Sequence, residues 1–229
     1  MKISELYELY KQHPVICTDS RKITAGCIYF SLKGATFDGN SFALAALQKG
    51  ASYSITDNNL LRETDGLIKV ENGLKTLQDL AAYHRQQFDI PVIGITGSNG
   101  KTTTKELMYS VLSQKFNVLA TLGNFNNHIG VPLTLFGLNT THEIAIIEMG
   151  ASRQGDIKEL CDIANPNYAL ITNIGKAHLE TMGGLEGVLK TKTELFDHIR
   201  MNGGKLLVHS CDKLLVENVR SKEAFYYGA

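Results

Sequence analysis

The most informative segment of the chain is Pro91-Val92-Ile93-Gly94-Ile95-Thr96-Gly97-Ser98-Asn99-Gly100-Lys101-Thr102-Thr103-Thr104. Its apolar part, Val92 to Ile95, is typical of a buried parallel strand, and the residues from Lys105 to Gln114 have helical spacing. A glycine-rich turn and a lysine lie between the two elements. This order predicts a phosphate cradle, because the N–H groups of such a loop and the positive end of the helix face the same point.

The segment departs from the general P-loop pattern at one position, since Ile95 stands where that pattern has its first glycine. The alternative interpretation is a strand-to-helix turn with an incidental lysine. The joint occurrence of strand, Gly-Lys-Thr and helix favours a nucleoside triphosphate site, with the Thr102 hydroxyl on Mg²⁺. The residues predicted to bind the nucleotide are Gly97, Ser98, Asn99, Gly100, Lys101, Thr102 and Thr103.

The composition is that of a soluble globular protein. The 229 residues are 43% hydrophobic and 20% charged, enough for one large or two small domains. Lys and Arg total 23, and so do Asp and Glu, which argues against a general nucleic-acid binder. Phosphate affinity is therefore expected to come from local loops.

The cysteines and the apolar runs bear on the compartment. Cys17, Cys27, Cys161 and Cys211 lack CxxC spacing, so we expect reduced core thiols and no zinc site. No apolar run approaches the ~18 residues that a bilayer span requires, and the N-terminus lacks the apolar region of a signal peptide. We expect a cytoplasmic protein without membrane insertion.

Two α/β domains are predicted, residues 1–88 and 89–229. In the first, helices are expected at 3–12, 41–49 and 74–88, with strands at 15–18, 27–32, 51–56 and 67–70. Asp89-Ile90-Pro91 then breaks the last helix. The second is predicted to be a doubly wound parallel sheet, with strands at 92–96, 117–121, 144–149, 168–173 and 205–209 and helices between them. An apolar strand begins near Phe225, so we expect the chain to end within this domain.

Sites in doubly wound sheets lie beyond the carboxyl ends of the strands, which makes Glu148 a candidate. It follows the apolar run Ile144–Ile147, where a carboxylate is costly unless it is paired. A Mg²⁺ held by Thr102 would pair it, as the second acidic motif does in P-loop enzymes. The alternative is an ordinary glutamate that caps a loop.

Three further candidates are weaker on their residues alone. His178 follows the strand at 168–173, although a lone histidine more often has a structural or surface role. The Asn-rich loop Gly123–Gly130, which contains His128, is expected either to bind sugar or phosphate oxygens or to form Asx turns. Lys190 and Lys192 fit a solvated helix face.

Together these segments resemble the Mur ligases, the ATP-dependent amide-forming enzymes of peptidoglycan synthesis. The phosphate loop is similar to theirs, including the missing first glycine. Asp19-Ser20-Arg21-Lys22, Gly26–Gly34 and Asp38–Phe42 resemble their UDP-sugar-binding N-terminal domain. Gly123–Pro132 and Glu148–Ala151 look most like the member that adds D-alanyl-D-alanine. The resemblance thus implies a UDP-sugar domain followed by part of a P-loop ATPase domain.

The resemblance implies specific roles at the phosphate site. Lys101 would hold the phosphates of ATP, Thr102 and Glu148 would bind a first Mg²⁺, and His178 would sit at a second. Lys192 matches the lysine that CO₂ carbamylates in most of these ligases, which needs an amine with a lowered pKa. Lys101, His178 and Lys192 are therefore the expected catalytic residues.

The resemblance also implies the substrates, UDP-MurNAc-tripeptide and D-Ala-D-Ala, and a monomer. The carboxylate of the tripeptide would attack the γ-phosphate, and the amine of D-Ala-D-Ala would then attack the acyl phosphate. Members of this family are longer, so we expect this chain to be a fragment without ligase activity. The residues expected to contact the UDP part are Ser20, Lys33, Ala35, Thr36 and Phe37, and those expected to contact the muramoyl part are Asn127, Ser152 and Arg153.

Two other functions remain open at this stage. Other members of the superfamily, such as the ligase of the preceding tripeptide stage or folylpolyglutamate-type ligases, share the phosphate loop. The second alternative is a nucleotide-binding module without catalysis. The Asp-Ser-Arg and Asp-Gly-Asn segments of the first domain argue against the folylpolyglutamate type.

Overall fold

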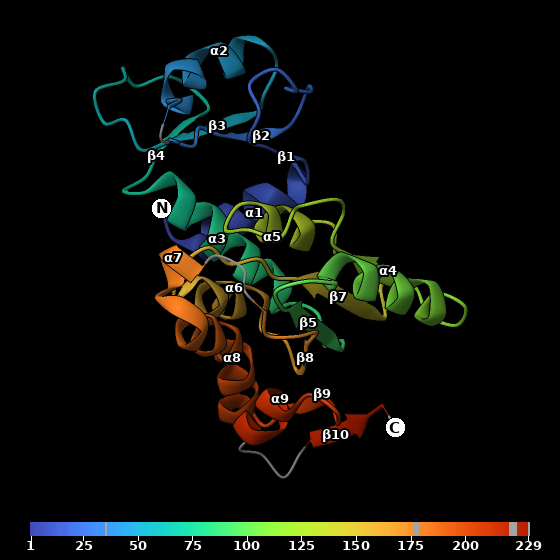
Figure 1. The fold of residues 1–229 in the computed structure, drawn as a ribbon. Coiled ribbons are helices and arrows are strands. Elements are labelled where there is room, and N and C mark those ends of the chain that lie inside the picture. The colour runs from blue at the N-terminus through green and yellow to red at the C-terminus, as the bar shows by residue number, and fades with distance from the viewer. Residues whose placement is uncertain (35, 176–178, 220–223, 229) are drawn as a thin grey trace. The chain divides into compact units, whose positions relative to one another are not determined.

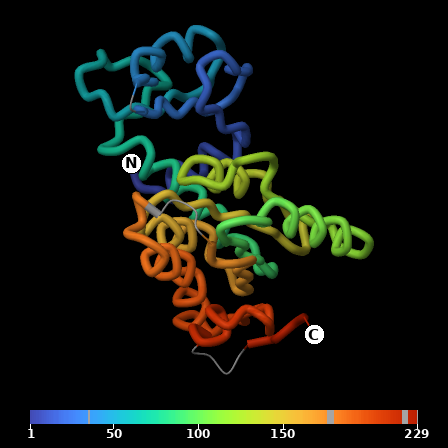
Figure 2. Tube along the Cα trace, in the orientation of Figure 1, coloured from blue at the N-terminus to red at the C-terminus, as the bar shows by residue number. Residues whose placement is uncertain are grey.

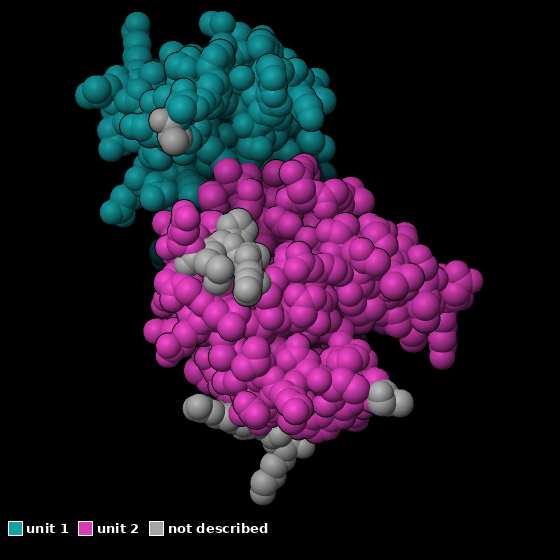
Figure 3. Space-filling model, viewed as in Figure 1, with its two compact units in different colours: residues 1–84 teal, residues 85–229 magenta. Residues whose placement is uncertain are grey.

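The computed structural model describes residues 1–34, 36–175, 179–219 and 224–228, with the Leu179 side chain left out. The chain forms two compact units, residues 1–84 and 85–229 (Figure 3). Asp89, where we expected the second domain to begin, lies inside the second unit. None of the described helices has both the length and the apolarity that a membrane span requires.

The first unit is built on a small parallel sheet in the order β1-β2-β3-β4. Its core joins Cys17, Cys27 and Tyr29 to Ala51 and to Ala46, which brings α2 onto the sheet. The helix expected at 41–49 begins earlier, as a 3-10 turn, because the Asp38 carboxylate accepts the N–H of Asn40. The elements are α1 (Ile3–Gln12), β1 (Ile16–Cys17), β2 (Ile28–Phe30), η1 (Gly39–Phe42), α2 (Ala43–Gln48), β3 (Tyr53–Thr56), β4 (Leu67–Lys69) and α3 (Gly73–Arg85).

The second unit is built on a six-stranded sheet in the order β10-β9-β8-β5-β7-β6, and every pair of neighbours is parallel. Helices alternate with the strands along the chain (Figures 1 and 2). The elements are β5 (Val92–Thr96), α4 (Lys101–Leu112), β6 (Val118–Ala120), α5 (Gly130–Leu135), β7 (Ile144–Glu148), α6 (Asp156–Ala164), β8 (Tyr168–Ile171), α7 (Leu179–Met182), α8 (Gly184–Asn202), β9 (Lys205–His209), α9 (Lys213–Asn218) and β10 (Ala224–Tyr227).

The direction of the crossovers places helices on both faces of this sheet. α4 carries the chain from β5 past β7 to β6, whereas α6 and α8 carry it the opposite way, to β8 and β9. Right-handed crossovers then put α4 on one face and α6 with α8 on the other. The predicted doubly wound parallel sheet is confirmed, and β5 lies where the direction changes.

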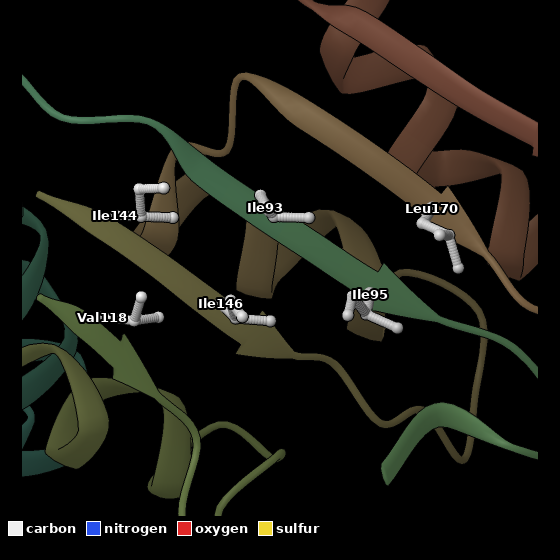
Figure 4. Close-up of a cluster of buried hydrophobic side chains, with 6 residues drawn as sticks. All are labelled: Ile93, Ile95, Val118, Ile144, Ile146 and Leu170. Carbon is white, nitrogen blue, oxygen red and sulfur yellow. The ribbon is translucent and has the colours of Figure 1, made fainter. Parts of the chain in front are cut away.

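The central strand β5 is covered by side chains on both of its faces. Ile93 and Ile95 join Ile146 and Leu170 in one apolar cluster, against which Met108 of α4 packs (Figure 4). The opposite face of β5 approaches α8 closely, since a Cβ at Gly94 would lie 3.0 Å from the Leu195 side chain. The phosphate loop therefore begins at a strand held from both sides.

Three of the four cysteines are buried as expected, and the fourth is exposed. Cys17, Cys27 and Cys161 are buried free thiols, as expected, and burial raises the pKa of Cys17. Cys211 is also free but exposed, so the expectation of a core thiol was wrong there. It lies in the short turn between β9 and α9, where the neighbouring Ser210 is exposed as well.

Candidate nucleotide-binding site

The phosphate loop leaves β5 at Gly97 and enters α4 at Gly100. Both glycines have a positive φ, +142° and +78°, which other residues adopt only with strain. None of the residues that the structure describes accepts a hydrogen bond from the backbone N–H of Gly100, Lys101, Thr102 or Thr103. Successive free donors at the positive end of a helix form an anion site. The backbone geometry is that of an anion site, and phosphate binding there stays a prediction.

The loop after β8 braces the phosphate loop through Asn173. Its side chain accepts the N–H of Asn99 at 3.1 Å and donates to the Asn99 carbonyl at 3.0 Å, while its own carbonyl accepts the N–H of Ser98. The Thr172 hydroxyl also donates to the Asn99 carbonyl, at 2.6 Å. We did not predict these contacts, because they join loops that are far apart in sequence.

The Lys101 side chain folds back over the loop. Its Nζ donates to the Gly97 carbonyl at 2.8 Å. Burial lowers the pKa of Lys101, and the negative charge of Glu148 opposes that shift. The predicted cation and the predicted carboxylate therefore lie within electrostatic reach of one another.

Glu148 ends β7 and is only 1% exposed. Asn126 donates to its Oε1 at 2.8 Å, but its buried Oε2 has no hydrogen-bond partner among the described residues. A half-satisfied buried carboxylate is unfavourable, and a cation that prefers oxygen ligands would supply the missing partner.

The donors at this position fit Mg²⁺. Thr102 is an exposed residue on the first turn of α4, next to Lys101. Within the described parts of the chain no three His, Cys, Asp or Glu side chains form a metal-binding group. Mg²⁺ keeps several waters and is held by one or two protein groups plus phosphates, so it needs no such group.

Lys192 is buried in α8, at 2% exposure, whereas Lys190 is exposed as the helix pattern suggested. Reading Lys192 as part of a solvated helix face was therefore wrong. Burial and the charge of Lys101 lower the pKa of Lys192 to about 8, while Asp156 and Glu194 act in the opposite direction. An amine with this pKa is partly neutral near physiological pH.

A cavity of about 360 Å³ brings many of these groups together. Asp156 and Glu159 also line it, although we did not predict them as binding residues, and so do Asn126 and His128 of the Asn-rich loop. Other predicted site residues belong to the same loops and element ends but are not among the lining residues: Asn99, Gly100, Thr102, Thr103, Glu148 and Arg153. The predicted site residues that do line it are Gly97, Ser98, Lys101, Asn127, Ser152 and Lys192.

Asp156 organises the loop after β7. Its carboxylate accepts the backbone N–H groups of Ser152 and Arg153 at 2.8 and 3.0 Å, and the Arg153 guanidinium at 2.9 Å. Burial raises the pKa of Asp156, but these hydrogen bonds outweigh it and leave the pKa below its ordinary value. The sequence signal of an aspartate at a helix start can be recognised, but the conformation of the loop that this aspartate stabilises cannot be predicted from it.

The Asn-rich loop forms the Asx turn that its sequence allowed, while the binding of sugar or phosphate oxygens stays a prediction. The Asn127 side chain accepts the N–H of Ile129 at 3.1 Å and of Gly130 at 2.8 Å, so it forms an Asx turn at the start of α5. Asn127 and His128 also line the cavity. His178, the other histidine that we predicted, lies outside the described residues.

The candidates of the first unit follow two neighbouring strands. Ser20 is buried and comes after β1, and Lys33 is exposed and comes after the parallel strand β2. Thr36 and Phe37 are exposed in the turn that the bridge between Lys33 and Asp38 closes. The ring of Phe37 stacks on Phe42, with centroids 5.5 Å apart. Ala35 lies outside the described residues.

Two family models match the chain. The model of the Mur ligase middle domain matches residues 95–228, and the model of the Mur ligase family catalytic domain matches residues 14–85. Together they cover both units.

Individual relatives agree with the family models. The UDP-N-acetylmuramoyl-tripeptide–D-alanyl-D-alanine ligase of Bacillus subtilis (strain 168) is 40% identical over 215 residues, 93% of this chain and 47% of that protein. The crystal structure of MurF from Acinetobacter baumannii has a TM-score of 0.88 and 33% identity over 96% of this chain and 52% of that one. MurF ligase from Thermotoga maritima in complex with ADP has a TM-score of 0.85 and 35% identity over 94% of this chain and 50% of that one. The chain therefore spans about half the length of these relatives.

Proposed function

The chain belongs to the Mur ligase family, and we propose that it carries the ATP-phosphate and UDP-sugar sites of a ligase that adds D-Ala-D-Ala to UDP-MurNAc-tripeptide. The similarity to ligases named for this reaction supports the choice of substrates. The similarity to a MurF ligase in complex with ADP supports the nucleotide.

Two observations on the described residues carry the proposal: none of them accepts the backbone N–H groups from Gly100 to Thr103, and none is a hydrogen-bond partner of Glu148 Oε2. We propose that these amides and Lys101 bind the ATP phosphates, with Ser98, Asn99 and Gly97 shaping the loop. Thr102 and Glu148 would hold Mg²⁺, which offsets the negative charge of the phosphate oxygens when it is bound.

Within this site the proposed chemistry is the phosphorylation of a carboxylate. Lys101 would stabilise charge on the transferring phosphoryl group, while Asn127, Ser152 and Arg153 would orient the muramoyl peptide near it. Phosphoryl transfer breaks the bond between the β- and γ-phosphates and forms an acyl phosphate. The amine of D-Ala-D-Ala would then displace phosphate and form the amide.

We propose that Lys192 accepts CO₂ as its neutral amine and becomes an oxygen donor for a second Mg²⁺, with His178 as the neighbouring ligand. The lowered pKa of Lys192 supports this reaction, because only the neutral amine reacts with CO₂. We further propose that Ser20, Lys33, Ala35, Thr36 and Phe37 bind the uridine diphosphate. We also propose that the protein is cytoplasmic and monomeric.

Titration calorimetry with MgATP tests the nucleotide site. Lys101→Met should lower the affinity about 10- to 100-fold, because a charge-assisted hydrogen bond contributes about 1.5–3 kcal/mol. Lys115→Met, which removes a lysine just after the end of α4, is the matched control and should bind as the wild type does. Equal affinity for ATP in all three proteins would refute the phosphate site.

A second titration tests the substrate class. UDP-MurNAc-tripeptide should bind the chain, and Lys33→Met should weaken that binding while MgATP affinity stays unchanged. Binding of ATP without any binding of the UDP-sugar peptide would leave a nucleotide module and contradict the ligase assignment.

A further inference from the structure

Lys105 is a buried cation that the proposed chemistry does not use. It lies on α4, one helical turn after Thr102, and is 1% exposed. Its Nζ donates to the backbone carbonyl of Thr121 at 2.6 Å and pairs with Glu106 at 2.8 Å. The Glu106 side chain is 61% exposed, so this ion pair is a surface pair with little energetic weight. Burying a lysine is unfavourable, which makes the contact with Thr121 the one to explain.

Thr121 connects that contact to Glu148. It follows β6 directly, and its N–H donates to the Ile146 carbonyl of β7 at 3.0 Å. Its hydroxyl accepts the backbone N–H of Glu148 at 2.9 Å. One residue therefore receives Lys105 on its carbonyl and Glu148 on its hydroxyl, so α4 and the end of β7 are joined through Thr121.

We infer that Lys105 is a positioning residue that keeps Glu148 in register with Thr102 through Thr121. The inference rests on the proposed function, since it takes Thr102 and Glu148 as the residues that hold Mg²⁺. Thr102 and Lys105 share one rigid helical turn, so a shift of α4 relative to β7 would move the two oxygen donors apart. Groups that orient metal ligands typically change metal affinity about 10- to 100-fold when they are removed.

The readout is the affinity for ATP in the presence of Mg²⁺ divided by the affinity for ATP in the presence of EDTA, both measured by calorimetry. A purely structural role would lower thermal stability and change both affinities together, which leaves the ratio unchanged. Lys105→Met and Thr121→Val should each reduce the ratio about 10-fold. Thr121→Ser keeps the hydroxyl and should retain the wild-type ratio. Glu106→Gln, which removes the exposed partner of Lys105, is the matched control and should also retain it.

A double change tests whether the two residues act through one connection. Lys105→Met combined with Thr121→Val should reduce the ratio no further than the larger single effect, because residues in one network are not additive. If Lys105→Met does not fold, the contrast between Thr121→Val and Thr121→Ser decides the question.

The outcomes separate the inference from the proposed function. A wild-type ratio of one would show that Mg²⁺ does not assist ATP binding, and it would overturn both. A wild-type ratio well above one that persists in folded Lys105→Met or in Thr121→Val would overturn the inference alone. A lower ratio in Thr121→Ser, equal to that in Thr121→Val, would also overturn it.

Discussion

Replacing Gly97 by alanine tests whether the brace from the β8 loop sets the shape of the phosphate loop. A Cβ at this position would overlap the Thr172 hydroxyl and lie 3.1 Å from both the Cβ and the N atom of Thr172. The φ of +142° adds backbone strain. The contact is with a strand end and its backbone, so a simple side-chain rotation does not relieve it.

The magnitude for Gly97→Ala follows from three terms. Positive φ costs about 1–2 kcal/mol and overpacking costs about 1–3 kcal/mol, whereas the loss of a glycine from the unfolded chain returns about 0.4–1 kcal/mol. The net strain is about 3 kcal/mol, and displacement of the loop relieves it. We expect MgATP affinity to fall about 10- to 100-fold, as measured by titration calorimetry.

Gly203→Ala is the matched control for this change. Gly203 has a φ of +71°, but among the described residues no heavy atom beyond its chain neighbours lies within 4 Å of the Cβ position. It ends α8 just before β9 begins. It therefore lies at the amino ends of the parallel strands, whereas the phosphate loop lies at their carboxyl ends. We expect a stability loss of about 1 kcal/mol, or about 2–4 °C in Tm, with unchanged ATP affinity. If Gly97→Ala binds MgATP within about threefold of wild type, the reasoning from Thr172 is refuted.

Three further predictions concern the carboxylates and the buried lysine. Glu148→Gln should lower ATP affinity about 10-fold or more with Mg²⁺ but not with EDTA, as measured by calorimetry; an equal loss in both would contradict metal binding. Lys192→Met should raise the free energy of unfolding by about 3 kcal/mol near pH 7, because the folded pKa of about 8 lies below the ordinary 10.5. Urea unfolding should show this gain shrinking as the pH rises from 8 to 10.5; a gain that does not depend on pH would point to packing alone. Asp156→Asn should lower the free energy of unfolding by about 1–2 kcal/mol at neutral pH. That difference should disappear as the pH falls from 3.8 through the lowered pKa, and a difference that persists in acid would contradict it.

The secondary structure around the phosphate site was predictable because its signals are local. The apolar run Val92–Thr96 becomes β5 with the expected bounds, and Gly100 followed by Lys101 starts α4. Helix ends were less predictable, since a single side chain shifts them. The Asp38 carboxylate turns the start of the helix expected at 41–49 into η1.

Burial of polar side chains was the hardest property to predict. Lys190 and Lys192 have equivalent sequence signals, but the Lys192 side chain is buried in α8, while Lys190 is exposed. Which side of α8 meets α6 depends on the whole sheet, because the crossover direction places both helices on one face. The pKa of about 8 at Lys192 follows from that packing, and no short window of sequence contains it.

The sequence alone fixes the strand, loop and helix that present free N–H groups and Lys101, because hydrogen bonding and apolar periodicity act between near neighbours. It also fixes the parallel α/β class through the alternation of elements. The tertiary structure adds the brace of Asn173 on Asn99, 74 residues away, and the buried amine of Lys192. It also buries Glu148 Oε2, which has no hydrogen-bond partner among the described residues. These depend on which strands become neighbours, and neighbours in a doubly wound sheet come from distant parts of the chain.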